Sequence, residues 1–288
     1  MQQTFRILNG NSPRIVLPKG AVDTHIHIFD STKYSAQNGG PGIPADALVK
    51  HYEAVQKWLG IENVVIIQGN GYQFDNRCVL EALDHFGKKA RAIVAIKPNI
   101  SDAEIDVMSK LGVVGARIIN ILKGAAGLDL LLDINARVEP FGWNLTVQFD
   151  GREMLDHMPL LEQIQGDYVI DHTGKFLEPV SVDSPQFKAL LKLIDRGNCY
   201  VKLAGCYETS IIGHPEYTDV ATLSKALINH APDRIIWGTN WPHNSSNSAD
   251  NYPDEVHLLN LISDWAVNDE NRQKIFVDNP YKLYGFNQ

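Results

Sequence analysis

The sequence has few cysteines, no long apolar run and no surplus of positive charge, and each absence excludes a class of protein. Its 288 residues contain three isolated cysteines, Cys78, Cys199 and Cys206, and no C-x-x-C pair. An odd number of isolated cysteines does not make a disulfide framework, so we expect free thiols. No apolar stretch approaches the roughly 18 to 20 residues of a membrane span. Residues 1–20 also lack a signal-peptide pattern, and we expect a cytoplasmic protein without membrane contact.

The charge balance is acidic and argues against nucleic acid as a partner. Lys and Arg total 26 against 34 Asp and Glu, which gives a net charge of −8 that repels polyanions. Any acidic ligand must therefore be bound by a few local cations. No exposed heptad or apolar stripe indicates a subunit interface, so we expect a monomer whose partner is a small molecule.

Short β-rich runs alternate with amphipathic helical segments along nearly the whole chain. Strict alternation of strand and helix predicts parallel strands joined by right-handed crossovers. Eight such units in one chain favour a closed (β/α)8 TIM barrel, a single domain over 1–288 with an N-terminal extension at 1–20. An open doubly wound sheet is the alternative. The predicted strands are 21–27, 63–68, 91–96, 113–118, 145–149, 168–171, 199–203 and 234–237, and the clearest helices are 45–59 and 184–195.

Polar residues stand at the carboxyl ends of the predicted strands, where a parallel barrel carries its active site. Two polar loops, 30–44 after the first strand and 242–253 after the eighth, would lie over the same face. We expect a small-molecule pocket there, with 30–44 as a candidate lid.

Three histidines belong to these strand ends. His25 and His27 alternate with Ile26, so both imidazoles point to the same side of the first strand, and His172 ends the sixth. Such a set suits metal binding or acid–base catalysis. The structural alternative is a pair of histidines that share hydrogen bonds in a polar core.

Two cations interrupt otherwise apolar strands. Arg117 stands in the sequence GARII and Lys202 between two apolar residues, and each requires an anion if it is buried. We expect Arg117 to bind an acidic ligand. An internal ion pair with Asp150 or Asp171 is the alternative, and Lys202 has the same two options. The other candidate binding residues are Gln68, Asn70, Gln148, Tyr207, His243 and Asn244.

Three motifs, in this order along the chain, resemble the amidohydrolase superfamily: VDTHIH from residue 22, DHTG from residue 171 and WGTNWPH from residue 237. Within it, the chain is most similar to the branch of 2-pyrone-4,6-dicarboxylate lactonases and D-galactarolactone isomerases, and closest to the latter. The resemblance extends over essentially the whole chain. It implies a (β/α)8 barrel that acts on lactones of acidic compounds, often without a metal.

The sequence departs from this family at position 240, where the hydrolases of the superfamily have an aspartate and this chain has Asn240. An amide cannot take a proton from water near neutral pH, which places direct hydrolysis in doubt. A metal site would also lose its carboxylate. If a metal such as zinc were present, His25, His27 and His172 would hold it, but we expect no cofactor.

The resemblance, together with the missing aspartate, implies a lactone isomerase that converts D-galactaro-1,5-lactone to the 1,4-lactone in sugar-acid catabolism. The nucleophile is then a hydroxyl of the substrate, so no water need be activated. His172 and His27 are the candidate base and acid, and His25 and Asn240 the donors to the lactone oxygen and its oxyanion. Arg117 would hold the free carboxylate, helped by Lys202 or Gln148. A lactonase and a non-catalytic sugar-acid binding barrel are the alternatives.

Overall fold

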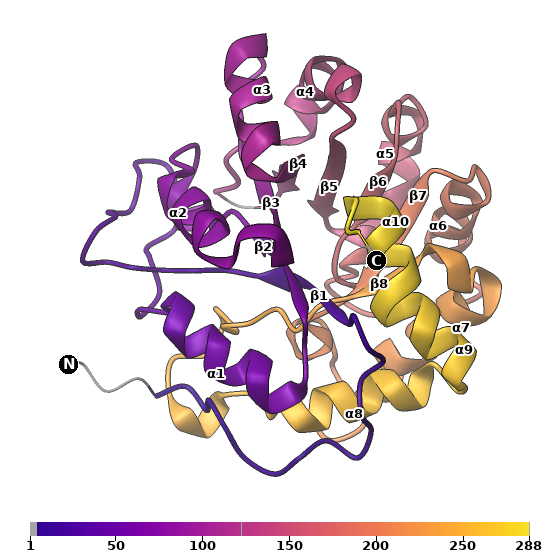
Figure 1. The fold of residues 1–288 in the computed structure, drawn as a ribbon. Coiled ribbons are helices and arrows are strands. Elements are labelled where there is room, and N and C mark those ends of the chain that lie inside the picture. Colours follow the sequence, from indigo (N-terminus) through magenta and orange to yellow (C-terminus); the bar gives the residue numbers. More distant parts are fainter. Residues whose placement is uncertain (1–4, 122, 288) are drawn as a thin grey trace.

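The computed structural model describes residues 5–121 and 123–287, and this part of the chain forms a barrel of eight parallel strands (Figure 1). Each strand pairs in parallel with the next along the sequence, in the order β1 to β8. The strands are β1 Val22–Ile26, β2 Asn63–Ile67, β3 Ala90–Val94, β4 Val113–Asn120, β5 Asn144–Phe149, β6 Tyr168–Ile170, β7 Cys199–Leu203 and β8 Ile235–Trp237.

Helices connect consecutive strands and surround the barrel, so the described chain is a single-domain (β/α)8 fold. The connecting helices are α1 Val49–Leu59, α2 Arg77–Phe86, α3 Asp102–Leu111, α4 Leu131–Val138, α5 Met154–Leu161, α6 Pro185–Asp195 and α7 Thr218–His230. The chain continues after β8 with α8 Glu255–Trp265, α9 Asp269–Gln273 and α10 Asn279–Tyr284.

The barrel closes where β1 meets the residues that follow β8. Ile26 and Trp241 form a parallel bridge, and the His27 N–H donates to the Trp241 carbonyl at 2.8 Å. The Asn240 N–H donates to the His25 carbonyl at 3.0 Å. These backbone contacts join the first and last strands, so the open-sheet alternative is wrong.

A buried carboxyl group reinforces this seam. Asp23 Oδ1 accepts hydrogen bonds from the N–H groups of His25 and Thr239, at 3.1 and 2.9 Å. Its Oδ2 accepts from the hydroxyls of Thr239 and Tyr52, at 2.6 and 2.9 Å. Burial raises the pKa of Asp23 to about 6, although these hydrogen bonds act to lower it. One side chain therefore ties β1 to β8 and to α1.

An irregularity in β1 decides which side chains face the barrel interior. Asp23 pairs with Val64 and Ile26 with Ile66, so β1 advances three residues while β2 advances two. Such a bulge shifts the alternation of side chains by one residue. As a result Ile26 lies in the outer hydrophobic cluster, and the neighbouring His25 and His27 lie on the inner side of the strand.

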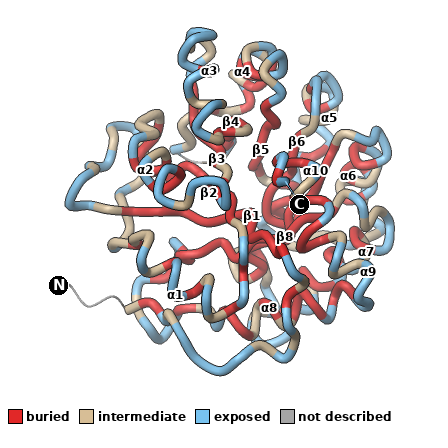
Figure 2. The backbone as a smooth tube through the Cα atoms, viewed as in Figure 1, coloured by how far each residue is buried: buried red, intermediate tan, exposed pale blue. Residues whose placement is uncertain are grey.

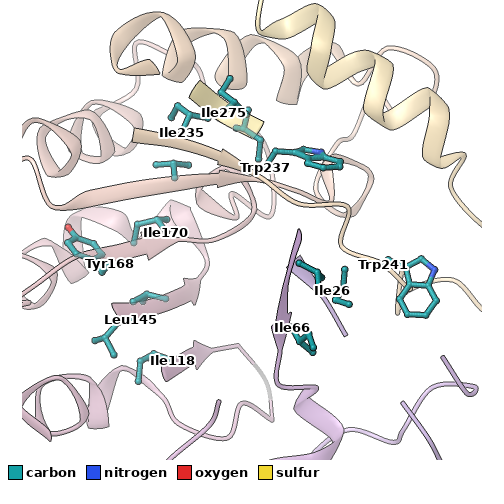
Figure 3. Close-up of a cluster of buried hydrophobic side chains, with 14 of the residues drawn as sticks. Ile26, Ile66, Ile118, Leu145, Tyr168, Ile170, Ile235, Trp237, Trp241 and Ile275 are labelled. Atoms are coloured by element: carbon teal, nitrogen blue, oxygen red, sulfur yellow. The ribbon is translucent and has the colours of Figure 1, made fainter. Parts of the chain in front are cut away.

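The hydrophobic core has two parts, and burial is concentrated in the strands (Figure 2). The larger part joins the outer faces of the strands to the helices, as Ile66, Ile118 and Ile170 illustrate (Figure 3). The smaller part includes interior strand residues together with Leu283 and Tyr284 of α10. Helix α10 therefore covers the amino-terminal end of the barrel.

The sequence placed all eight strands correctly, with bounds that differ by no more than two residues. Helix α1 begins at Val49, whereas we expected it from residue 45. The difference arises because Ala47 forms an antiparallel bridge with Phe29, which keeps the preceding chain extended. Gly60 ends α1 in the left-handed conformation, with φ 78°, as its position predicts.

The N-terminal extension forms no helix or strand over residues 5–20, and residues 1–4 lie outside the described chain. It runs along α1 and α8, where the Trp58 indole donates to the Asn11 carbonyl and Arg14 pairs with Asp264. The three cysteines are buried free thiols, as expected. None of the described helices combines the length and apolar character that a bilayer crossing requires.

Gly238 permits the closest approach at the seam, and its replacement tests the importance of closure. A Cβ at this position would lie 2.5 Å from the His25 Cβ and 2.7 Å from the His25 nitrogen. We expect Gly238→Ala to lower the free energy of unfolding by about 1–3 kcal/mol in urea titrations, because backbone would have to move. Gly42→Ala, where a Cβ meets open space, is the control and should change stability little. Wild-type stability of Gly238→Ala would contradict the tight seam.

Candidate active site

Inward positions of the strands change from apolar to charged at the carboxyl end of the barrel. Val169 and Tyr200 belong to the interior hydrophobic cluster. Two residues further along the same strands come Asp171 and Lys202, both with no exposed surface. Since side chains alternate along a strand, these charges lie on the same side as the interior cluster. The carboxyl end of the barrel therefore holds a buried polar layer.

Lys202, His25 and His27 form a directional chain of hydrogen bonds. His27 Nδ1 lies 2.9 Å from the Ile67 carbonyl, which can only accept, so this nitrogen carries the proton. His27 Nε2 must then accept from His25 Nε2 at 3.1 Å. His25 Nδ1 is left to accept from the Lys202 ammonium at 3.2 Å. Each ring carries one proton. His27 donates its proton to a backbone carbonyl, and His25 donates its proton to His27.

Burial keeps both imidazoles of this pair neutral. It lowers the pKa of His27 to about 3, with a further contribution from the Arg117 guanidinium. Burial likewise holds the pKa of His25 well below its usual value, although Asp171 acts in the opposite direction. At neutral pH these side chains can donate and accept hydrogen bonds, but they carry no charge.

Asp171 is the counter-charge to Lys202. The Lys202 Nζ lies 3.3 Å from Asp171 Oδ1, and His25 Nδ1 lies 3.4 Å from the same oxygen. Burial opposes ionisation of this carboxyl group, but Lys202 and His25 outweigh it and hold its pKa well below the usual value. The sequence alternative of an internal ion pair is therefore correct for Lys202.

His172 has a ring nitrogen available for chemistry. Its Nδ1 donates to the Ala204 carbonyl at 3.3 Å, which leaves Nε2 as the unprotonated nitrogen. No hydrogen bond from the described residues reaches that Nε2, and its nearest acidic atom, Asp171 Oδ2, lies 3.9 Å away. Burial and the Lys175 ammonium lower the pKa of His172 to about 4. His172 is therefore neutral near pH 7 and can accept a proton.

A second ion pair stands beside His172, and sequence reasoning missed both of its members. Glu208 pairs with Lys175, and the Asn240 amide donates to Glu208 Oε1 at 2.8 Å. Burial opposes ionisation of Glu208, but His172 and Lys175 lower its pKa to about 2. Glu208 thus supplies a carboxylate next to the position where hydrolases of the superfamily carry an aspartate. The available signals were the lysine in HTGKF and the position of Glu208 directly after Tyr207.

The structure corrects the expected role of Asn240. Because Glu208 is an ionised acceptor, the amide atom that faces it must be Nδ2. The same nitrogen lies 2.9 Å from the Tyr207 oxygen, so both of its protons are engaged. Asn240 therefore has no N–H left to donate to a substrate oxygen. Its Oδ1 receives no hydrogen bond from the described residues and is the atom available to a ligand.

Arg117 is a buried cation without a buried anion of its own. The residue is 6% exposed, and its guanidinium donates to the Gln68 carbonyl at 2.9 Å and to Gln148 Oε1 at 3.0 Å. Its Nε has no partner, and no carboxylate within residues 5–121 and 123–287 forms an ion pair with it. Asp150, one candidate partner, pairs with Arg152 instead. The internal ion pair considered for Arg117 is therefore not formed.

The other predicted binding residues separate into two groups. Gln148 and Gln68 contact Arg117, and Asn70 lies beside them, where its amide donates to the Lys123 carbonyl. Gln68, Asn70 and Arg117 line a small cavity. Asn244 is exposed, outside this group.

Tyr207 and His243 face one another instead of the cavity. The Tyr207 hydroxyl lies 2.6 Å from His243 Nδ1, and His243 Nε2 lies 2.7 Å from Glu255 Oε1. Both nitrogens of this fully buried imidazole are therefore occupied by protein groups. The structure assigns His243 to holding Tyr207 and leaves it no nitrogen for a ligand, contrary to our expectation.

Left-handed backbone conformations gather at the same strand ends. His172 and Thr173 after β6, and Asn240 and His243 after β8, all have φ between 51° and 64°. Residues with a side chain seldom adopt this conformation, and each instance costs on the order of 1 kcal/mol. Such strain is typical of functional sites, where the surrounding contacts fix the direction of a side chain.

The donor set is a poor fit for a divalent metal. His25, Asp171 and His172 each offer one atom within 4.8 Å of the others, a spacing that one ion could span. The Lys202 ammonium, however, already lies within 3.3 Å of both His25 Nδ1 and Asp171 Oδ1. A second cation there would meet strong repulsion in a buried site. Asn240 offers only a neutral amide oxygen in place of a carboxylate.

The candidate lid packs against the loop that follows β2. The Gln37 N–H donates to the Gly71 carbonyl at 2.9 Å, and a Cβ at Gly40 would lie 3.0 Å from the Asn70 carbonyl. Segment 30–44 thus contacts residues that adjoin the cavity next to Arg117. Its action as a lid stays a prediction.

Comparisons with known proteins agree with this architecture. Residues 22–286 match the model of the amidohydrolase family. The chain is 41% identical to a D-galactarolactone isomerase of Agrobacterium fabrum, over 99% of this chain and 97% of that protein. It is 34% identical to a 4-sulfomuconolactone hydrolase of Hydrogenophaga intermedia, over 96% and 92% of the two chains. An apo structure from Agrobacterium tumefaciens, 41% identical, superposes with a TM-score of 0.95 and covers 98% of this chain and 99% of that one.

The chain belongs to the amidohydrolase family, as the three motifs indicated. Its relatives include a lactone isomerase and lactone hydrolases, which confirms the branch that the sequence predicted.

Proposed function

We propose that the protein is a lactone isomerase that converts D-galactaro-1,5-lactone to the 1,4-lactone by intramolecular acyl transfer. A relative that matches this chain over nearly its full length is a D-galactarolactone isomerase. This substrate keeps one free carboxylate outside the ring, so the site must offer one cation that is not neutralised by the protein.

The charge balance of the buried layer carries the proposal. Lys202 is paired with Asp171, and Lys175 with Glu208. Arg117 is left as the buried cation of this layer that lacks an acidic partner in the described chain. A guanidinium binds a carboxylate through parallel hydrogen bonds, and Arg117 keeps N–H groups that no described residue engages. The carboxylate of a monoanionic lactone would supply that partner.

His172 is suited to act as the general base. In the proposed reaction its Nε2 takes the proton of the substrate 4-hydroxyl as that oxygen attacks the C1 carbonyl carbon. The tetrahedral oxyanion then collapses, the bond from C1 to the ring oxygen breaks, and the oxygen on C5 leaves. The proton returns from His172 to that oxygen, so one imidazole serves as base and then as acid. His27, whose two nitrogens are engaged, is not needed as the acid.

His25 and proximity supply the remaining catalysis. The His25 Nε2 proton, now shared with His27, is the ring proton that an entering lactone oxygen can capture, and it would stabilise the oxyanion. Holding the hydroxyl beside the carbonyl contributes roughly 7 to 11 kcal/mol relative to a bimolecular reaction. The missing aspartate at position 240 is then no obstacle, because no water is activated.

We propose further that the enzyme needs no metal and acts as a cytoplasmic monomer on a small-molecule substrate. The position of the Lys202 ammonium supports metal independence, since it neutralises Asp171 from within the protein. The three unpaired thiols are consistent with a reducing compartment.

A proton NMR time course tests the reaction. Enzyme treated with a chelator is mixed with freshly generated D-galactaro-1,5-lactone, whose ring protons differ from those of the 1,4-lactone. We expect the 1,4-lactone to appear faster than in the enzyme-free blank. The relatives that are lactone hydrolases make water attack the second candidate. Accelerated release of open-chain galactarate would favour that candidate, and spectra identical to the blank would contradict both.

Replacement of Arg117 tests the carboxylate contact. Arg117→Met removes a charge-assisted hydrogen-bonded pair worth about 1.5–3 kcal/mol, so we expect KM to rise roughly 10- to 100-fold with a smaller change in kcat. Arg137→Met, which removes a half-buried guanidinium paired with Asp102, is the control. Melting temperatures of both variants show whether the fold survives. An unchanged KM for Arg117→Met would exclude this contact.

The pH dependence tests the role of His172. Its neutral form is the active one, and burial places its pKa at about 4. We therefore expect kcat/KM, corrected for spontaneous reaction, to be constant from about pH 5 to about pH 8 and to fall as the pH drops through about 4. His172→Ala should abolish conversion while lactone binding survives, and His230→Ala should be fully active. An acid limb near the ordinary histidine pKa, or activity in His172→Ala, would remove His172 from the mechanism.

A further inference from the structure

Three buried side chains and the half-buried Tyr207 connect helix α8 to the active site in an unbroken series of hydrogen bonds. Glu255, in the first turn of α8, lies 2.7 Å from His243 Nε2. His243 Nδ1 lies 2.6 Å from the Tyr207 oxygen, which lies 2.9 Å from Asn240 Nδ2. Glu255 and His243 are 2% and 0% exposed, so these groups have little access to water. The proposed mechanism does not use Glu255, His243 or Tyr207.

One arrangement of protons satisfies every contact in this series. Asn240 Nδ2 faces the ionised Glu208, so its second proton goes to the Tyr207 oxygen. Tyr207 accepts there and donates its own hydroxyl proton to His243 Nδ1. The His243 ring is then protonated at Nε2, which donates to Glu255. The donors therefore follow one another without conflict.

We propose that Glu255, His243 and Tyr207 are positioning residues that hold the Asn240 amide with Oδ1 free for the substrate. In this role Asn240 Oδ1 accepts a hydrogen bond from a substrate hydroxyl next to the attacking one, whose own proton goes to His172, and so orients the attacking oxygen toward the lactone carbonyl. The inference rests on the proposed isomerase function for the identity of that hydroxyl. The orientation of the amide follows from the protein alone.

Two features indicate that this arrangement serves orientation. An amide has two ends of similar size, and without fixed partners it can rotate by half a turn and present N–H groups in place of oxygen. Glu208 and Tyr207 bind the same nitrogen from two sides, which excludes that rotation. Asn240 and His243 also share the left-handed backbone conformation, with φ 64° and 56°. Fully satisfied buried networks of this kind specify a single geometry.

A double-mutant cycle tests the proposal. Tyr207→Phe keeps the ring but removes the oxygen that binds Asn240. We expect kcat to fall by about 10-fold with KM nearly unchanged, as for loss of one buried hydrogen bond. In an Asn240→Ala background the same change should have little further effect, since there is no amide left to orient. Tyr281→Phe, which removes a hydroxyl bonded to Asn63 near the other end of the barrel, is the control. If Tyr207→Phe lowers kcat by the same factor with and without the Asn240 side chain, the proposal is wrong.

A second measurement does not depend on turnover. Nitrogen-15 NMR spectra of the histidine-labelled wild-type protein report which ring nitrogen of His243 is protonated, with His243→Gln used for assignment. We expect the neutral ring with the proton on Nε2. A proton on Nδ1 would reverse the Tyr207 hydrogen bond and overturn the proposal. If the wild type converts no lactone, the proposed function fails and this measurement still decides the orientation.

Discussion

The hydrogen bonds between β1 and the end of β8 are the constraint on which the site depends. β8 has only three residues, so the seam relies on the Asp23 carboxyl group and on two backbone contacts near His25 and Asn240. These contacts set the distance between the histidines of the first strand and the amide of the last. The groups at the two ends of the fold thereby become neighbours, and the polar layer exists only in the closed barrel.

Within that layer, electrostatics explains why residues of ordinary type behave unusually. Burial penalises every charge, so Lys202 and Lys175 each pair with a carboxylate, and His25, His27 and His172 are neutral. Asp171 takes Lys202 as its counter-ion, and Glu208 takes Lys175. Lys202 in particular balances the carboxylate from within the protein. The histidines beside it take part in hydrogen bonds with protein groups.

Sequence reasoning predicted the barrel because the spacing of apolar residues in strands and helices is a local property of the chain. It also found the polar strand ends, since Arg117, His172 and Asn240 interrupt apolar patterns. It missed Lys175 and Glu208, which lie in loops after β6 and β7, where left-handed turns decide side-chain directions and no period applies. The role of Asn240 was predicted wrongly for a related reason. Which amide atom faces the ligand depends on Glu208, 32 residues away in the chain.

The bulge in β1 has a consequence for how this family can change over time. Insertions and deletions are tolerated in surface loops, such as the segment 30–44, because loop length costs little free energy. Inside β1, loss of one residue would restore simple alternation and exchange the two sides of the strand beyond it. His25 and His27 would then turn toward the helices, and Ile26 would enter the polar layer. A single-codon deletion there removes the site in one step. Selection should therefore eliminate deletions in this strand, while the neighbouring loop varies in length.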